Sequence, residues 1–126
     1  LGVRRHFHYS AVNNAGQVWR TECNSLVDID GSARPSAAAH AAMVWLLDDA
    51  DPIGIETVNV DSADVRVASF RSPSRGTIRV VWSRTPIAAA RVPKLLDGAR
   101  EIRDLMGNPV IGPAELSAAP IYILVR

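Results

Sequence analysis

The stretch that decides the fold begins at Glu56 and consists of short alternating segments: ETVNV (56–60), VRVASF (65–70), TIRVVWS (77–83), AARVP (89–93), REIRDL (100–105) and IYILVR (121–126). Alternation of apolar and polar residues is typical of β-strands, because successive side chains point to opposite faces of a sheet. Turn-forming sequences separate the segments: SPSRG, SRTP, LDG and GNP. Strands and turns at this spacing favour an antiparallel sandwich or barrel.

We therefore predict an antiparallel sandwich of six to eight strands over residues 56–126. The apolar positions of the alternating segments should form its core. They are Val65, Val67, Val80, Trp82, Ile102, Leu105, Ile121 and Ile123.

The residues before this stretch follow other patterns. GVRRHFHYS (2–10) alternates and predicts a strand over 3–9, followed by a long loop rich in turn-forming residues. Pro35 suits the first position of a helix, and the alanine-rich run after it predicts a helix over 35–48. One face of that helix holds five small or apolar residues, Ala38, Ala41, Ala42, Trp45 and Leu46.

Composition excludes several classes of protein. Apolar residues make up 48% of the chain and charged residues 21%, as in soluble domains with a packed core. The net charge is +1 and the basic residues are scattered, so we expect no nucleic-acid partner. Cys23 is the single cysteine, which leaves no intrachain disulfide. The apolar run 37–47 is too short to span a bilayer, so we expect no membrane association.

A strand, a loop and one helix followed by an all-β region suggest the end of a larger fold. LGVRRHFHYS (1–10) resembles the eighth barrel strand of clan A-type retaining glycoside hydrolases. LVDIDGSARPSAAAHAAMVWLLDDA (26–50) resembles the turn and helix that follow that strand. RVVWS (79–83), REIRDLMGNPV (100–110) and APIYILV (119–125) are similar to strands of the β-sandwich appended to those barrels.

The resemblance implies an α+β fragment with two parts. Residues 1–52 would be the final β/α unit of a (β/α)8, or TIM, barrel, and residues 53–126 a mainly antiparallel C-terminal β-sandwich. The implied function is that of a C-terminal segment of a glycosidase, a hydrolase of O-glycosyl bonds in carbohydrate metabolism. Its partners would be a carbohydrate substrate and the remainder of the barrel, on the same or another chain.

The resemblance also implies that the catalytic carboxylates lie elsewhere. Retaining enzymes use an acid/base and a nucleophile about 5–5.5 Å apart, and in this group these come from barrel strands that would precede Leu1. We expect the carboxylates of the chain to be surface groups. Those considered are Glu22, Asp28, Asp30, Glu56, Glu101 and Glu115.

The chain could still contribute one wall of the sugar cleft, because barrel sites form at the C-terminal ends of the strands and in the loops that follow. The residues in that zone that suit sugar binding are Tyr9, Asn13, Asn14 and Trp19. Aromatic rings offer a flat apolar face, and asparagine offers a donor and an acceptor. Relatives often carry a tryptophan soon after this tyrosine, whereas here Ser10, Ala11 and Val12 follow.

His6 and His8 share one strand face at a spacing that could serve a metal. A third ligand would have to be Glu22, Cys23 or His40, and the spacing selects none of them. We therefore predict no metal site, and nothing in the sequence indicates a cofactor.

A second interpretation is a non-catalytic β-sandwich module that binds carbohydrate or protein. Such a module needs an exposed aromatic row, whereas Phe70, Trp82 and Tyr122 each lie in an apolar alternation that favours the core. The two interpretations differ in the exposure that they predict for three aromatic side chains. If the chain completes a barrel, then Phe7, Tyr9 and Trp45 should contact another chain or be unusually exposed.

Overall fold

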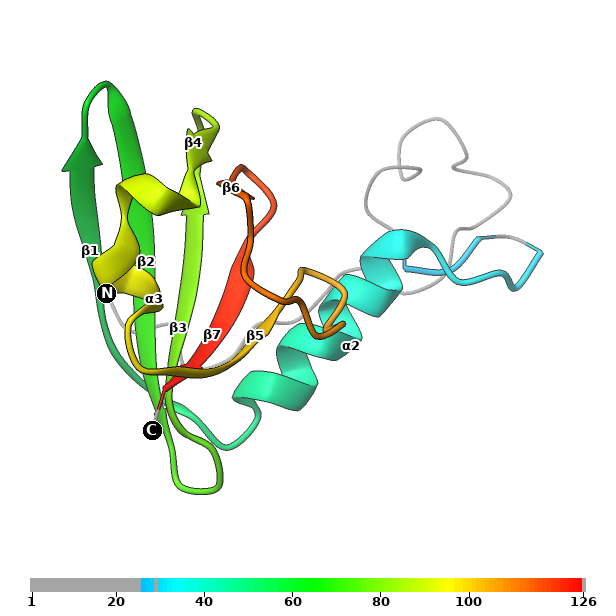
Figure 1. Ribbon diagram of the computed structural model, residues 1–126. Helices are drawn as coiled ribbons and strands as arrows, with labels where there is room; N and C mark the ends of the chain where they lie inside the picture. The colour runs from blue at the N-terminus through cyan, green and yellow to red at the C-terminus, as the bar shows by residue number, and fades with distance from the viewer. Residues whose placement is uncertain (1–25, 29, 126) are drawn as a thin grey trace. The chain divides into compact units, whose positions relative to one another are not determined.

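The computed structural model describes residues 26–28 and 30–125 (Figure 1). The chain divides into two compact units, residues 1–41 and 42–126. In the first unit, a turn is closed by a bridge between Val27 and Ala33, and helix α2 (Pro35–Leu47) begins directly after it. The helix agrees with the prediction of 35–48, and its last residues belong to the second unit.

The second unit contains a five-stranded antiparallel sheet in the order β1-β2-β3-β7-β5 and a two-stranded sheet of β4 and β6. The strands are β1 (Asp51–Val60), β2 (Ala63–Ser72), β3 (Gly76–Ser83), β4 (Ile87–Ala88), β5 (Ala99–Arg103), β6 (Glu115–Leu116) and β7 (Ile121–Val125). Two short helices lie between β4 and β5: the 3-10 helix η2 (Ala89–Arg91) and α3 (Pro93–Leu96).

Most of the predicted strand pattern is present. Seven strands lie within residues 51–125, and all ladders in both sheets are antiparallel, which is compatible with a β-sandwich. The prediction of a strand at AARVP (89–93) is wrong, because η2 and the start of α3 occupy it. Pro93 stands in the first turn of α3, where a missing N–H costs nothing.

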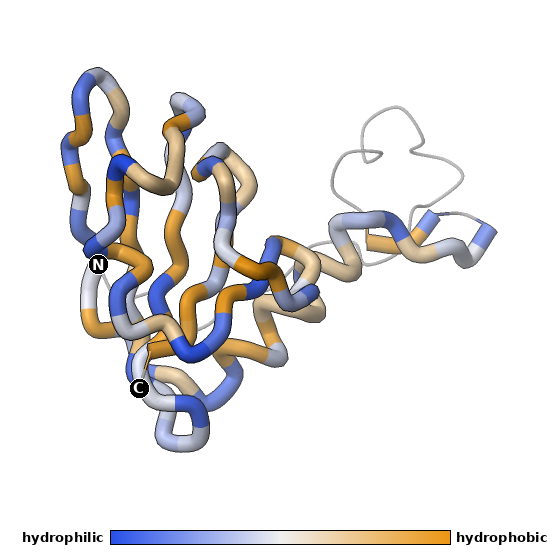
Figure 2. The backbone as a smooth tube through the Cα atoms, viewed as in Figure 1, coloured by the Kyte–Doolittle hydropathy of each residue, from blue (hydrophilic) through white to orange (hydrophobic). Residues whose placement is uncertain are grey.

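One face of the five-stranded sheet carries the larger core. Alternating apolar side chains from the strands pack there against the two-stranded sheet and the short helices, and Figure 2 shows hydrophobic and hydrophilic segments alternating along the strands. The buried members are Ala63, Val65, Val67, Val81, Ile87, Val92, Leu116, Ile121 and Ile123. We call this the inner face.

The opposite face, which we call the outer face, carries a smaller cluster. Leu46 near the end of α2 packs there with Ile78, Tyr122 and Leu124. Partly buried side chains from the helix and the strands surround them: Met43, Leu47, Phe70 and Val80. The end of α2 therefore covers part of the outer face.

The predicted core is confirmed in part. Val65, Val67, Ile121 and Ile123 are buried. The other four predicted residues are only partly buried: Val80, Trp82, Ile102 and Leu105. One of them, Trp82, lines an open groove.

The predicted helix face is also confirmed in part. Ala42 and Leu46 are buried, whereas Trp45 is 50% exposed, as we expected of that residue. The other two aromatic residues of that expectation, Phe7 and Tyr9, lie outside the described residues. No helix in the described ranges is long and apolar enough to cross a membrane.

Asp49, just after α2, links the end of the helix to the turn between β2 and β3. Its Oδ1 accepts a hydrogen bond from Ser72 Oγ at 2.7 Å, and its Oδ2 accepts one from Ser74 Oγ at 2.5 Å. Arg75 adds an ion pair at 3.4 Å. The Ser74 and Ser72 hydroxyls, chiefly, hold the pKa of Asp49 below its ordinary value.

Candidate functional site

The residues that we predicted for the sugar cleft, Tyr9, Asn13, Asn14 and Trp19, lie outside the described residues, and so do His6 and His8. The roles proposed for them stay predictions. Within residues 26–28 and 30–125, no group of three or more His, Cys, Asp or Glu side chains is placed to hold a metal ion.

Three of the carboxylates considered in the sequence are held by neighbouring groups. Asp28 forms an ion pair with Arg34 at 2.5 Å, and Glu101 forms one with Arg103. Asp30 is exposed, and hydrogen bonds from the side chain and backbone of Ser32 lower its pKa. Lowered pKa values favour the ionised form, whereas a general acid must hold its proton at working pH.

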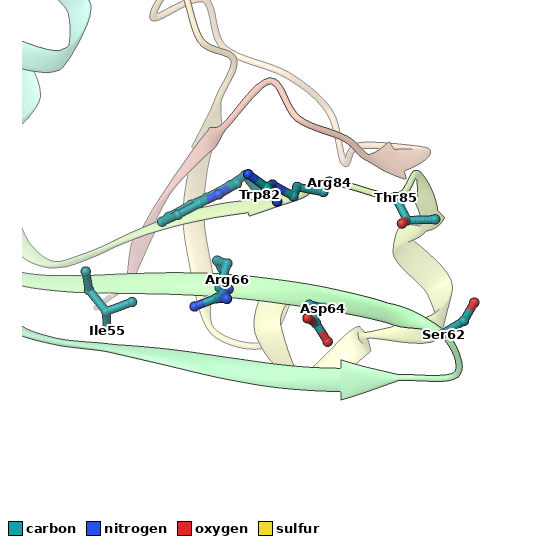
Figure 3. A pocket seen from close by; sticks show the side chains of 7 residues that line it. All are labelled: Ile55, Ser62, Asp64, Arg66, Trp82, Arg84 and Thr85. Carbon is teal, nitrogen blue, oxygen red and sulfur yellow. The ribbon is translucent and has the colours of Figure 1, made fainter.

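A groove of about 530 Å³ opens where β1, β2 and β3 approach the β1–β2 turn. Figure 3 shows the side chains that line it, with those of Arg66, Trp82 and Arg84 gathered over β2 and β3. The complete lining is Ile55, Ser62, Asp64, Arg66, Trp82, Arg84 and Thr85. A smaller cavity of about 210 Å³ adjoins it through Ile55, on the edge strand β1.

The strand register assembles the centre of this groove. Arg66 on β2 lies directly opposite Thr57 on β1 and Trp82 on β3. Residues directly opposite in an antiparallel pair have Cβ atoms about 4.5–5.5 Å apart. The neighbours of Arg66, Val65 and Val67, point to the opposite side and belong to the buried inner face.

The two arginines of the groove are unpaired within residues 26–28 and 30–125. Among the described residues, no hydrogen bond or ion pair engages the side chain of Arg66 or Arg84. The exposed Asp64 carboxylate likewise has no side-chain partner in that part of the chain. The groove therefore has a formal charge of +1 beside one aromatic ring.

A second aromatic–arginine cluster provides a contrast. Arg75 lies 5.2 Å and Arg103 4.8 Å from the centroid of the half-exposed Trp45 ring. Both of these arginines are already engaged: Arg75 pairs with Asp49, and Arg103 with Glu101. This cluster joins the helix to the sheet and leaves no free guanidinium for a ligand.

Sequence reasoning missed the groove because it assigned Trp82 to the core. Trp82 follows Val80 in alternation, and a pattern of apolar residues does not reveal which part of a sheet face remains uncovered. Arg66 and Arg84 are visible in the sequence as arginines, but the sequence does not show that they lie near Trp82. Only the β2–β3 register brings Arg66 beside the ring.

Comparison with known proteins gives one informative similarity. The chain is similar to a solved structure of a family 39 glycoside hydrolase from the gut symbiont Bacteroides cellulosilyticus WH2, with a TM-score of 0.54 and 23% identity. The match covers 82% of this chain and 22% of that chain. No family model and no curated protein matches the sequence. The similarity concerns the fold, and the chain spans about a fifth of the matched enzyme's length.

Proposed function

We propose that this chain is the C-terminal segment of a glycoside hydrolase. Residues 1–52 would supply the final β/α unit of a (β/α)8 barrel, and residues 53–126 the β-sandwich that braces it. The observation that carries the proposal is the fold similarity to a family 39 glycoside hydrolase over 82% of the chain. The motifs of the sequence support the same assignment independently.

In this proposal the substrate is a carbohydrate, and four residues form one wall of its cleft: Tyr9, Asn13, Asn14 and Trp19. The catalytic pair would come from the remainder of the barrel. One of the described carboxylates bears on this division: Asp30 is stabilised in its ionised form and so does not suit the general-acid role. Binding a sugar is not sufficient for hydrolysis, because cleavage of the glycosidic bond also needs a proton donor for the leaving group and a nucleophile.

The bracing role is supported by the contact between the end of α2 and the sheet. Leu46 is fully buried among sheet residues, and Asp49 accepts hydrogen bonds from Ser72 and Ser74. A helix tied to the sheet by both apolar packing and hydrogen bonds would transmit the stability of the β-sandwich to the barrel. This accounts for an extra domain that supplies no catalytic group.

The first test measures hydrolysis of nitrophenyl glycosides by the 126-residue chain. We expect no turnover above the uncatalysed rate. Turnover that is abolished by changing Glu22, Asp28 or Asp30 would contradict the proposal, because it would place a complete active site within the chain.

The second test uses the enzyme reassembled with its barrel. Tyr9→Ala or Trp19→Ala should lower kcat/KM by about tenfold or more, equal to about 1.4 kcal/mol, if the ring stacks on sugar. Tyr9→Phe and Trp19→Phe are the matched controls, because they keep a flat ring and should retain most of the activity. Equal loss in the alanine and phenylalanine variants would argue against stacking.

A non-catalytic binding module remains the second candidate, and the observation that favours it is the open groove at Trp82. The two candidates differ in one measurement. Adding the barrel gives hydrolysis if the chain is the C-terminal segment of a glycosidase, and gives none if it is a freestanding module.

A further inference from the structure

We propose that the groove over Arg66, Trp82 and Arg84 is a binding site for an anionic saccharide, a sugar that carries a carboxylate or a sulfate. This inference goes beyond the proposed function, because it concerns the open sheet face and not the barrel cleft. It also holds whether or not the chain is part of a hydrolase.

Trp82 supplies the surface for the sugar ring. It is partly buried in the lining of the groove, and its cross-strand neighbour is a charged residue, Arg66. An indole held by a β-sheet is a rigid, flat platform with little entropy to lose on binding. Aromatic rings of this kind combine apolar contact with a polar N–H that can reach a hydroxyl group.

Arg66 and Arg84 supply the charge selectivity. Guanidinium groups bind oxyanions with two parallel hydrogen bonds, and such charge-assisted bonds are stronger than neutral ones. Elsewhere in the described residues, Arg34, Arg75, Arg91 and Arg103 form ion pairs with aspartate or glutamate. Neither arginine of the groove has such a partner among those residues, so both can bind an anion without first breaking a contact.

The rest of the lining suits sugar hydroxyl groups. Ser62 and Thr85 each offer a hydroxyl, and Asp64 offers a carboxylate that accepts hydrogen bonds. The volume of about 530 Å³ lies within the range of small-molecule sites, about 300–1,000 Å³. These groups favour a polyhydroxylated ligand over a bare anion.

The polarity of the face favours a saccharide over a protein partner. Under the helix, the residues opposite one another are apolar, as in Phe70, Ile78 and Leu124. At the groove the opposed residues on β2 and β3 are Arg66 and Trp82. Burying unpaired charges beneath a protein is unfavourable, whereas a hydrated sugar leaves them partly in water.

The test follows the indole N–H signals of the 126-residue chain by NMR, assigned with tryptophan-to-phenylalanine variants. The probes are oligogalacturonate, a sulfated carrageenan oligosaccharide, a neutral xylo-oligosaccharide and sodium sulfate. We expect the Trp82 signal to shift with at least one of the two anionic saccharides, and the first two probes distinguish carboxylate from sulfate. Binding should weaken as salt rises, because exposed charges are screened.

Matched variants assign the effect to the groove. Arg66→Ala and Arg84→Ala should each weaken binding by about tenfold, equal to about 1.4 kcal/mol. Arg71→Ala and Arg100→Ala are the controls, because these arginines are also exposed and outside the groove lining, and they should leave binding unchanged. Trp82→Phe should keep more affinity than Trp82→Ala, with circular dichroism to verify the fold of each variant.

Several outcomes would overturn the proposal. One is no shift of the Trp82 signal with either anionic saccharide. Another is equal binding of the neutral oligosaccharide, or of sodium sulfate at the same concentration. A third is equal weakening by the control variants. If adding the barrel protected the Trp82 indole and abolished saccharide binding, the face would instead be a protein interface. Hydrolysis assays are independent of all these results.

Discussion

The outer face of the five-stranded sheet has two halves that differ in what covers them. Under the end of α2, opposed strand positions carry Phe70, Ile78 and Leu124, and Leu46 fills the space above them. Toward the β1–β2 turn, the same strands carry Arg66 and Trp82 and line an open groove. The same strands, with the same alternation of side chains, run through both halves. The halves therefore differ only in which side chains they carry and in whether α2 covers them.

This comparison shows how one sheet face can serve two purposes. Apolar residues under the helix contribute stability by leaving water, at roughly 25 cal/mol per Å² buried. Exposed, unpaired charges contribute little to stability and are available to a ligand. We therefore expect substitutions in the covered half to affect folding and those in the open half to affect binding.

The largest expected loss of folding stability is that of Leu46→Ala, in the half that α2 covers. Leu46 is fully buried, and truncating a buried leucine costs about 2–5 kcal/mol because a cavity remains. Urea unfolding followed by circular dichroism measures the loss. Val44→Ala is the control, because Val44 is 48% exposed and should cost far less. Equal losses in the two variants would mean that the helix does not pack on the sheet as described.

The next largest loss of folding stability is expected at Gly107, in the loop after β5. Its φ is +83°, and an added Cβ would lie 3.1 Å from the Cβ of Ala42 in the helix. Gly107→Ala should therefore cost about 1–2 kcal/mol from the left-handed backbone, with crowding in addition. Gly54→Ala is the control, because nothing lies within 4 Å of its added Cβ and no positive φ is involved. Unfolding midpoints that fall equally for both variants would contradict this.

A smaller effect depends on pH and tests the link at the end of the helix. Hydrogen bonds from Ser74 and Ser72 lower the pKa of Asp49, so its carboxylate stabilises the folded state fully above the unfolded pKa of about 4. That contribution is lost as the pH falls from about 4 through the lower folded pKa. Asp49→Asn should be less stable at pH 7 and should lose less stability on acidification. Parallel stability curves for the two proteins would refute the link.

The smallest effect on stability is expected in the open half. Arg66→Ala and Arg84→Ala should each change the free energy of unfolding by less than about 0.5 kcal/mol, because both side chains are exposed and unpaired among the described residues. Thermal unfolding measures this. A loss comparable with that of Leu46→Ala would show that the groove is structural, and would remove the contrast between the halves.

Most of the secondary structure could be predicted from the sequence, because alternation and turns are local properties. The four long runs ETVNV, VRVASF, TIRVVWS and IYILV all lie in strands. AARVP misled us because valine before proline also suits the approach to a helix. Strands β4 and β6 contain two residues each and leave no periodicity to detect.

The groove could not be predicted, because the residues that line it are determined by the strand register and by which part of the sheet face the helix covers. Arg66 and Trp82 lie in different strands, and the sequence does not specify that they oppose one another. Nor does it specify that the helix covers Ile78 and leaves Trp82 accessible. The cleft residues proposed from the resemblance, among them Tyr9 and Trp19, stay predictions, as does the division of the chain at residue 52.

Strand β7 lies between β3 and β5 in the sheet, although it follows both in sequence. The β1–β2 and β2–β3 pairs are joined by short turns, so this meander can form early with little loss of chain entropy. β5 pairs with no strand of the sheet except β7, so it must wait for a segment that lies some twenty residues further along. During synthesis and refolding, β5 would thus be the strand left longest without a partner, and the one most open to proteases and chaperones.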